Sequence, residues 1–459
     1  MPANPHQSIA VIGGGLTGLT AAYRLHQLGH RVTVFEKSPR VGGAVMSISK
    51  EGYLIECGPN SLQLGTRELA ALITELGLDP EMQVASPAAK KRFIVRGGRL
   101  LPTPSSPVSA FTTPLFSLRS ILGIFWEMTC RPRVRTTDIS LAEFVRSHFG
   151  QELVDYALNP FVSGVYAGDP EKLSTRYSFP SLWQAERTHG SVLRGLIAGA
   201  KERKARGEGG VPPMVSFRRG LQSLPDALAA HLPAGGVQTG ANVTNVIPGR
   251  PWKLIVMREG IAQTAEFDQV VLAVPANGLA ALVFGTLGER PLAVLDNLPH
   301  PPVSSLFLGY KREQVAHPLD GFGGLVPAIE RRQILGVLFS STLFPGRAPE
   351  GHVGLTVFAG GTRQPEIARL PTDALLAQVA PDLRDLVGAT GAPVFVNHTF
   401  WPRAIAQYNL GHERFLDAIA DCESKNPGLL IGGNCRDGIS LQDCVKAGLK
   451  LAQRAAGLP

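Results

Sequence analysis

The feature that most constrains this chain is a glycine-rich turn near its N-terminus. Residues 9–12 are apolar, and the pattern Gly-x-Gly-x-x-Gly follows at once with Gly13, Gly15 and Gly18. A helix-forming segment comes next, and then a strand that ends at Glu36. A strand, a glycine turn, a helix and a second strand ending in an acid is the order of a dinucleotide-binding unit. The alternative is a glycine-rich turn without a ligand, which this full context disfavours.

Each glycine of the turn has a physical task. Gly13 permits the tight turn, Gly15 lets the backbone approach a pyrophosphate, and Gly18 lets the helix pack closely against the strand. The free N–H groups at the helix start attract phosphate, and Glu36 can accept hydrogen bonds from a ribose diol. We therefore expect ligand contacts from Gly13, Gly14, Gly15, Leu16, Thr17, Gly18 and Glu36.

A second glycine pair follows the acidic strand. Gly42 and Gly43 would let the chain pass close to another part of the same ligand, with the basic residues Lys37 and Arg40 beside them. This extension resembles that of the FAD-containing amine oxidase superfamily, many members of which have Arg directly after the pair. This chain has Ala44 there, so a contact from that side chain is missing. An ordinary surface turn is the alternative interpretation.

The composition sets the class of protein. The chain has 459 residues, of which 44% are hydrophobic and 18% charged, as in a folded protein with a large core. Its net charge of +8 favours anionic partners, but no clustered basic helix indicates nucleic acid. The five cysteines show neither Cys-x-x-Cys nor zinc-ligand spacing, so we expect a reducing compartment and no metal. Residues 1–7 lack a secretory layout, which favours a cytoplasmic location.

Residues 118–135 form an apolar segment that could contact a membrane. Phe125 and Trp126 are bulky and apolar, but Arg119 and Glu127 make the run too short and too charged to span a bilayer. A helix of this kind can lie in a membrane interface, in this case at the inner face of the cell membrane. Packing on the core or around a pocket is the alternative.

The remaining pattern predicts a domain that is interrupted by insertions. Strands at 237–247, 267–275 and 428–434 return late to the dinucleotide unit, and the last is followed by glycines and a helix over 440–455. A second helix start would thus point at the same ligand. Further expectations are helices at 67–77, 138–160 and 191–206, a hairpin at 92–101 and a loop at 102–117.

Several segments away from the glycine turn resemble the protoporphyrinogen oxidase family. They span nearly the whole chain and comprise residues 58–61, 163–170, 179–186, 216–225, 341–345, 404–412, 432–434 and 438–444. The resemblance implies an α/β fold. A discontinuous Rossmann-type FAD-binding domain would cover 1–85, 210–275 and 400–459. A mainly helical, membrane-associating and substrate-entry region would cover 86–209, and an α+β substrate domain 276–399.

The resemblance also implies an activity. Family members use FAD to remove six electrons from protoporphyrinogen IX in heme biosynthesis, passing them in pairs to dioxygen to form hydrogen peroxide. The expected partners are a porphyrinogen, dioxygen, a membrane surface, the next enzyme of the heme pathway and a second copy of the chain, without nucleic acid. Coproporphyrinogen III is the alternative substrate. A large apolar macrocycle requires a broad apolar slot with a few polar groups, so we expect positioning rather than acid–base catalysis.

Site residues carry over from the resemblance position by position. Asn60, Leu325 and Phe344 match substrate-positioning residues, although a turn residue and ordinary core residues are the alternatives. Further cofactor contacts match Lys37, Gly42, Gly43, Gly58, Pro59, Val243, Gly433, Ile439 and Ser440. On charge alone, the candidate partners of the propionates are Arg96, Arg99 and Arg176.

Three rival functions remain. A covalent-flavin amine oxidase should show Ser-Gly-Cys near residues 395–412, where this chain has Phe-Trp-Pro-Arg at 400–403. A carotenoid desaturase stays open beside it. A pyridine-nucleotide flavoprotein would need a second glycine motif and often Cys-x-x-Cys, and neither is present. A non-catalytic scaffold would not need the family signatures on the presumed substrate side.

Overall fold

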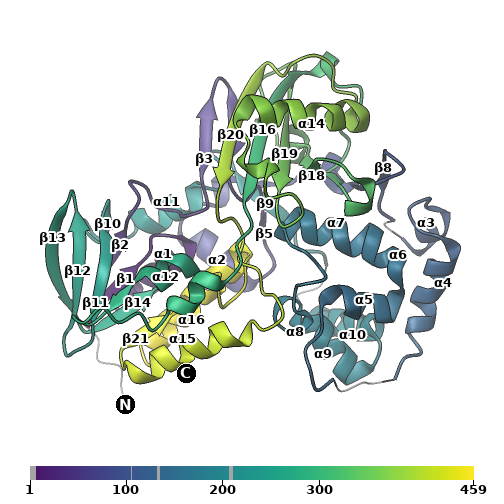
Figure 1. Ribbon diagram of the computed structural model, residues 1–459. Helices are drawn as coiled ribbons and strands as arrows, with labels where there is room; N and C mark the ends of the chain where they lie inside the picture. Colours follow the sequence, from purple (N-terminus) through teal and green to yellow (C-terminus); the bar gives the residue numbers. More distant parts are fainter. Residues whose placement is uncertain (1–6, 105, 132–134, 206–209, 459) are drawn as a thin grey trace.

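A five-stranded parallel sheet organises one side of the molecule (Figure 1). The computed structural model describes residues 7–104, 106–131, 135–205 and 210–458. The strand order is β10-β2-β1-β14-β21, so segments from four distant parts of the chain lie side by side. Their apolar runs are buried because helices cover one face, while an antiparallel sheet and two further helices cover the other. The strands are β1 (Ser8–Ile12), β2 (Arg31–Glu36), β10 (Val237–Thr239), β14 (Gln269–Leu272) and β21 (Leu429–Ile431).

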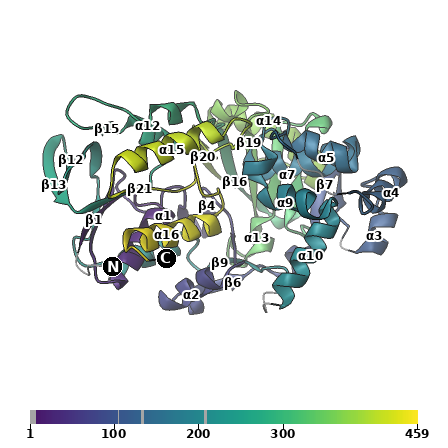
Figure 2. The same cartoon turned by 90° about the horizontal axis from the view of Figure 1, so that it is seen from below.

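Helices from both ends of the chain pack on this sheet. α1 and α16 lie against each other, and a Cβ atom on Gly448 of α16 would lie 2.6 Å from the carbonyl oxygen of Thr17. Figure 2 shows the two helices together, with α15 across β21. The helices are α1 (Leu16–Gln27), α2 (Arg67–Glu75), α11 (Ser223–Ala230), α12 (Ala276–Ala281), α15 (Glu413–Lys425) and α16 (Leu441–Ala455).

A four-stranded sheet in the order β13-β12-β11-β15 flanks the parallel one. Its strands are β11 (Asn242–Ile247), β12 (Trp252–Arg258), β13 (Ile261–Phe267) and β15 (Val283–Phe284). The prediction of one strand over 237–247 is wrong. Gly240 has φ of +66°, which turns the chain between β10 and β11 so that they join different sheets.

A seven-stranded sheet in the order β20-β16-β19-β18-β17-β7-β8 forms the upper part of Figure 1. The expected hairpin is confirmed as β7 and β8, and it joins this sheet through β17. Residues 92–102 thus lie in the sheet built mainly from residues 303–401. The expected domain limits, which assign residues 86–209 to the helical region, are wrong for this hairpin. The elements are β7 (Arg92–Arg96), β8 (Arg99–Pro102), β16 (Val303–Lys311), β17 (Gly323–Leu325), β18 (Ile334–Leu338), β19 (His352–Gly360), β20 (Phe395–Trp401), α13 (Ser340–Leu343) and α14 (Thr372–Val387).

Short elements connect these parts. Two small sheets consist of β3 (Ser47–Lys50) with β4 (Tyr53–Glu56), and of β5 (Leu62–Gln63), β9 (Met214–Phe217) and β6 (Met82–Val84). Single 3-10 turns lie at Asp79–Glu81, Pro87–Lys90, Ala293–Asn297, Arg312–Gln314, Ala328–Glu330 and Ile367–Arg369.

The helical region occupies the lower right of Figure 1. Its α-helices are α3 (Pro107–Thr112), α4 (Leu118–Glu127), α5 (Leu141–Phe149), α6 (Gln151–Leu153), α7 (Asn159–Phe161), α8 (Thr175–Ser178), α9 (Pro180–His189) and α10 (Val192–Ala205). The prediction of a loop over 102–117 is wrong in its middle, where α3 forms. Ser106 caps this helix by accepting a hydrogen bond from the Ser109 N–H.

The helix expected over 138–160 is also divided differently. It begins after the cap residue Ser140 and stops at Gly150, which has φ of +82°. Helical structure then resumes, with wider π-turns at Val154–Leu158 and Val162–Tyr166. π-turns are frequent at functional sites because they displace side chains from the regular helical positions.

Helix α4 presents apolar side chains to solvent. Leu118, Leu122, Phe125 and Trp126 are all exposed, and Trp126 is 73% exposed. Among the helices in the described parts of the chain, none combines the length and apolarity needed to cross a membrane. The sequence also predicts a basic flank after α4 from the arginines at positions 131, 133 and 135, and position 133 lies outside the described residues.

Candidate functional site

The first glycine turn lies at the carboxyl edge of the parallel sheet, between β1 and α1. Gly13 has φ of +109°, and a Cβ atom there would lie 2.5 Å from the Ala273 carbonyl oxygen, so only glycine fits. A Cβ atom on Gly18 would lie 2.0 Å from the Gly13 carbonyl oxygen. A Cβ atom on Gly15 would meet nothing within 4 Å. The turn is therefore packed tightly on one side and open on the other.

The start of α1 faces this opening with backbone groups. No side chain caps its first turn, whereas α2 and α16 are capped by Thr66 and Ser440. Leu16 and Thr17 are buried, so their contribution to a ligand is limited to the backbone. Uncapped N–H groups at a helix start fit an anionic pyrophosphate.

Glu36 links the turn to the next strand. Its carboxylate accepts hydrogen bonds from the N–H groups of Gly14 at 2.7 Å and Ser38 at 2.8 Å. Its carbonyl oxygen accepts a third from Ala241, which leads into β11 and the buried Val243. Glu36 and Val243, predicted from separate parts of the sequence, are thus brought to the same corner of the sheet.

The second glycine pair contacts the first turn directly. The Gly42 N–H donates to the Gly14 carbonyl oxygen at 2.8 Å, and Gly42 forms a β-bridge with Gly15. A Cβ atom on Gly43 would lie 3.4 Å from the Gly15 Cα atom. The two glycine turns therefore form a single cradle.

Arg40 holds the second turn in shape, a role that the sequence analysis missed. Its guanidinium donates to the carbonyl oxygens of Val45 at 2.9 Å and Gly43 at 2.7 Å. Lys37 is exposed and lies outside this arrangement of hydrogen bonds. An arginine close to a glycine pair is the sequence signal that could have suggested this role.

The C-terminal glycines reach the same edge of the sheet. Gly433 follows β21 with φ of +121°, and its N–H donates to the Asp437 carboxylate at 2.9 Å. Since β21, β14 and β1 are parallel neighbours, Gly433 and the first glycine turn leave the sheet at one edge. Ile439 packs against the core, and Ser440 caps α16 by accepting a hydrogen bond from the Asp443 N–H at 3.1 Å.

The segment Gly58, Pro59 and Asn60 runs under the second glycine turn. A Cβ atom on Gly58 would lie 2.0 Å from the Ala44 carbonyl oxygen, so the two segments touch through their backbones. The Asn60 amide donates to the Gly58 carbonyl oxygen at 3.0 Å. Asn60 thus makes the local contact of a turn residue, as the alternative interpretation holds.

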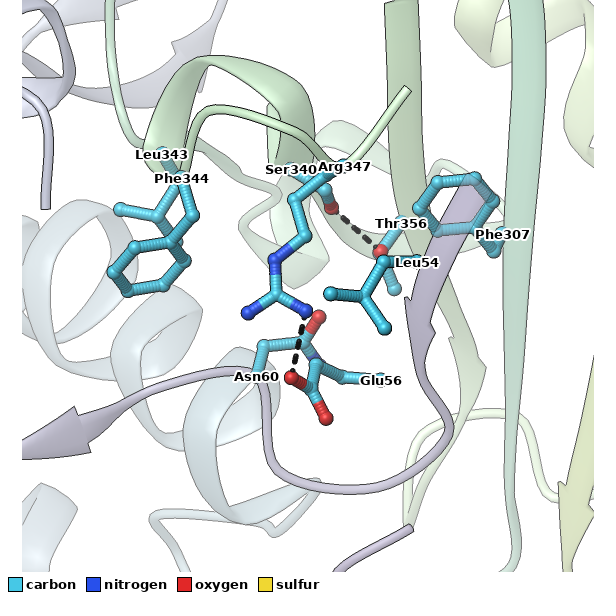
Figure 3. A pocket seen from close by; sticks show the side chains of 9 residues that line it. All are labelled: Leu54, Glu56, Asn60, Phe307, Ser340, Leu343, Phe344, Arg347 and Thr356. Carbon is cyan, nitrogen blue, oxygen red and sulfur yellow. Dashed lines mark hydrogen bonds and ion pairs between the residues drawn. The ribbon is translucent and has the colours of Figure 1, made fainter. Parts of the chain in front are cut away.

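Asn60 also lines a small cavity together with Phe344, which comes from a distant segment of the sequence just after α13 (Figure 3). The cavity holds about 10 Å³, room for about one water molecule. Phe344 is almost fully buried here and packs with Ala89 and Leu343. Two of the three predicted substrate-positioning residues are therefore brought together.

A buried ion pair forms the polar wall of this cavity. Arg347 donates to Glu56 at 2.9 Å and to the Ser216 hydroxyl at 2.5 Å, and the side chains of both ion-pair partners are nearly inaccessible. The Leu221 N–H also donates to Glu56. Burial raises the pKa of the Glu56 carboxyl group, while Arg347 and the Ser47 hydroxyl oppose that rise.

The Arg347 guanidinium also lies 5.4 Å from the centre of the Phe344 ring, within the range of a cation–π contact. Sequence reasoning missed the ion pair of Glu56 and Arg347, because the two residues are 291 positions apart.

The other predicted substrate residues lie elsewhere. Leu325 is on β17, where its side chain fills the space beside Gly164, and it does not line the cavity of Asn60. Arg96 is already engaged, since it pairs with Glu152 at 2.8 Å. Arg99 and Arg176 are exposed.

Comparison with known proteins places the chain in a family. The profile of the flavin containing amine oxidoreductases matches residues 16–456. Protoporphyrinogen oxidase 2 of Arabidopsis thaliana is 34% identical over 97% of this chain and 92% of its own length. The chain belongs to the protoporphyrinogen oxidase family, within the flavin-containing amine oxidoreductases.

Two further proteins are similar to this chain over nearly its whole length. Coproporphyrinogen III oxidase of Bacillus subtilis is 28% identical over 96% of both chains. A crystal structure from Exiguobacterium sp. 255-15 superposes with a TM-score of 0.81 at 23% identity, covering 98% of each chain, and shows a common fold.

The cofactor of this family fits the residues described above. FAD is an elongated dinucleotide, and the cradle offers tightly packed glycines, an open side at Gly15 and an uncapped helix start. The chain is therefore an FAD-dependent oxidoreductase of mixed α/β fold.

Proposed function

We propose that this protein oxidises protoporphyrinogen IX to protoporphyrin IX in heme biosynthesis. The observation that carries the proposal is the near full-length similarity to curated protoporphyrinogen oxidases, at 34% identity in the Arabidopsis relative. The substrate loses six electrons and six protons. FAD supplies a two-electron acceptor for each of three cycles, and dioxygen takes up the electrons and protons as hydrogen peroxide.

The chain's own residues have the task of positioning the macrocycle. Phe344 and Leu325 would supply apolar surface, and Asn60 would supply a polar group close to the cofactor cradle. Arg347 and Glu56 satisfy each other in the cavity wall, so neither presents a free charge. Because aromaticity drives the loss of hydride from a bridge carbon, a correctly held substrate requires no strong protein base.

Coproporphyrinogen III is the second candidate substrate, which the similarity to the Bacillus subtilis enzyme favours. It carries two extra propionates where protoporphyrinogen has two vinyl groups, and it therefore needs additional cations. Arg96 is committed to Glu152, which removes one of the three proposed partners of the propionates. The pairing of Arg96 and the higher identity to the protoporphyrinogen oxidases support protoporphyrinogen as the first choice.

We also propose a location and partners for the protein. We place the protein in the cytoplasm, attached peripherally to the inner face of the cell membrane through the exposed apolar side chains of α4. An apolar substrate is best delivered from such a surface. The next enzyme of the heme pathway and a second copy of the chain complete the proposed set of partners. The Rossmann-type assignment likewise stays a prediction, as do the domain limits except at residues 92–102, which join the seven-stranded sheet.

The test is an oxidation assay with both porphyrinogens under air. We expect the FAD-loaded protein to develop porphyrin fluorescence and consume oxygen, with a higher kcat/KM for protoporphyrinogen. Fluorescence no faster than the rate of the protein-free autoxidation control would contradict porphyrinogen oxidation. A higher kcat/KM for coproporphyrinogen would instead select the second substrate.

A further inference from the structure

Tyr408 connects three parts of the molecule that are distant in sequence. It lies in the segment before α15, and Figure 2 shows α15 and α16 on either side of β21. Its hydroxyl donates to the Asn434 carbonyl oxygen at 2.7 Å and accepts from the Gly438 N–H at 2.9 Å. One side chain thus spans both ends of the turn that precedes α16.

The backbone of the same residue is bound to the helical region. The Tyr408 carbonyl oxygen accepts hydrogen bonds from the Ser174 N–H at 2.8 Å and the Ser178 hydroxyl at 3.1 Å. The neighbouring Gln407 amide donates to the Tyr166 carbonyl oxygen at 2.7 Å. The position of the Tyr408 ring is therefore set by contacts outside the C-terminal turn.

His412 supports the ring from one face. The two rings are stacked, with centroids 4.1 Å apart and an angle of 22° between their planes. His412 is 1% exposed, and neither of its ring nitrogens has a hydrogen-bond partner among the described residues. Burial lowers the pKa of His412 to about 4, so at neutral pH the imidazole is an uncharged aromatic plate. Tyr177 and Phe415 pack around it.

The protonation state of Tyr408 suits this arrangement. Burial raises the pKa of its phenol well above the ordinary value, so the hydroxyl keeps the proton that it donates to Asn434. Gly433 and Gly438 have φ of +121° and +113°. A turn with two such residues has many alternative conformations, which the Tyr408 hydroxyl restricts.

We propose that Tyr408, supported by His412, is a positioning residue that preorganises the turn 433–440 for FAD. The inference rests on the proposed assignment of Gly433, Ile439 and Ser440 as flavin contacts. Without the hydroxyl, the free protein populates other conformations of the turn, and binding of FAD has to restore the competent one. The Asn434 carbonyl and the Gly438 N–H also lose a buried partner.

The experiment measures FAD binding to the apoprotein of Tyr408→Phe. We expect the Kd for FAD to rise about tenfold, since one bridging hydroxyl is lost while the ring and its stacking remain. The matched control is Tyr177→Phe, which also removes one phenol beside His412 but has no described hydrogen bond from its hydroxyl to the turn. The control should bind FAD within about twofold of the parent.

Thermal unfolding of each apoprotein separates positioning from stability. A merely structural hydroxyl would lower the melting temperature of the apoprotein and leave the Kd for FAD of the folded protein unchanged. That result overturns the proposal, as does an equal rise in Kd in both variants. Since the readout is binding of FAD, a protein that binds it normally but oxidises no porphyrinogen contradicts the proposed function and not this inference.

A second variant keeps the test decisive where Tyr408→Phe does not fold. His412→Ala leaves the hydroxyl and removes the plate that holds the ring, so we expect a rise in the FAD Kd of about threefold. His412→Phe keeps the stack and should restore the parent Kd. If His412→Ala binds FAD with an unchanged Kd, the imidazole has no part in positioning the turn. If Tyr408→Phe also fails to fold, that unchanged Kd overturns the proposal.

Discussion

The parallel-sheet region and the helical region are held together by different kinds of contact. In the sheet region, glycines let backbone segments approach each other closely. Gly18 packs on the carbonyl of Gly13, and Gly448 of α16 packs on the backbone of Thr17. Glycine makes these approaches feasible, and each one fixes the distance between two elements.

The helical region is held by a chain of buried polar side chains. Glu127 of α4 is fully buried and accepts hydrogen bonds from the Ser191 hydroxyl at 2.7 Å and the Val192 N–H at 2.5 Å. His148 lies between two carboxylates, 3.0 Å from Glu127 and 3.2 Å from Glu186. These contacts tie α4 to α5, α9 and the start of α10.

This difference shows how each region suits its proposed task. A cradle for a cofactor needs fixed backbone geometry, which tight glycine contacts supply. A membrane-facing helix needs its apolar side chains outside, so its inner face must be held by something other than those side chains. In α4, Glu127 provides that hold while Phe125 and Trp126 remain exposed.

The largest expected effect on stability comes from removing the buried hydrogen bonds of Glu127 in the helical region. Glu127→Ala leaves buried donors without an acceptor, and we expect it to reduce the free energy of unfolding by about 3–5 kcal/mol. Thermal unfolding followed by circular dichroism measures the change. Glu171→Ala is the control, because Glu171 pairs with Arg146 at the surface and its side chain is 52% exposed. Equal melting temperatures for the two variants would contradict the role of Glu127.

A smaller effect is expected from filling a glycine contact in the sheet region. In Gly18→Ala, the added methyl group meets the Gly13 carbonyl and displaces the turn, at a cost of about 1–3 kcal/mol. We expect a reduced content of FAD per chain, measured from the flavin absorbance of the purified protein. Gly123→Ala in α4 is the control, since a Cβ atom there meets nothing within 4 Å. Full flavin content in Gly18→Ala would show that the turn tolerates the displacement.

The smallest expected effect concerns the exposed face of α4. Trp126→Glu should reduce flotation with anionic liposomes about fivefold, because one of several apolar anchors is lost. Leu287→Glu is the control, since Leu287 is 89% exposed and lies outside the helical region. Equal flotation of both variants and the parent would exclude this face as the attachment site.

Local patterns predicted the strand, the tight turn and the helix at the start of the chain. The spacing of Gly13, Gly15 and Gly18 acts through backbone conformation over a few residues, so it could be read without the fold. The strand over 237–247 was mispredicted because its pattern is uniformly extended, and only the turn at Gly240 shows that the two halves join different sheets. Sequence patterns predict Asn60 and Phe344 separately. The cavity that they share could not be predicted, because only the topology of the chain brings the two residues together.

The sequence by itself determined that this chain binds a dinucleotide and belongs with the porphyrinogen-oxidising flavoproteins, because contiguous motifs encode both. Only the tertiary structure decided which side chains hold those motifs in place. Arg347 beside Glu56, and Tyr408 across the turn at Asn434, depend on how distant segments pack. No local pattern names a partner hundreds of residues away, since that choice is made by the folded chain as a whole.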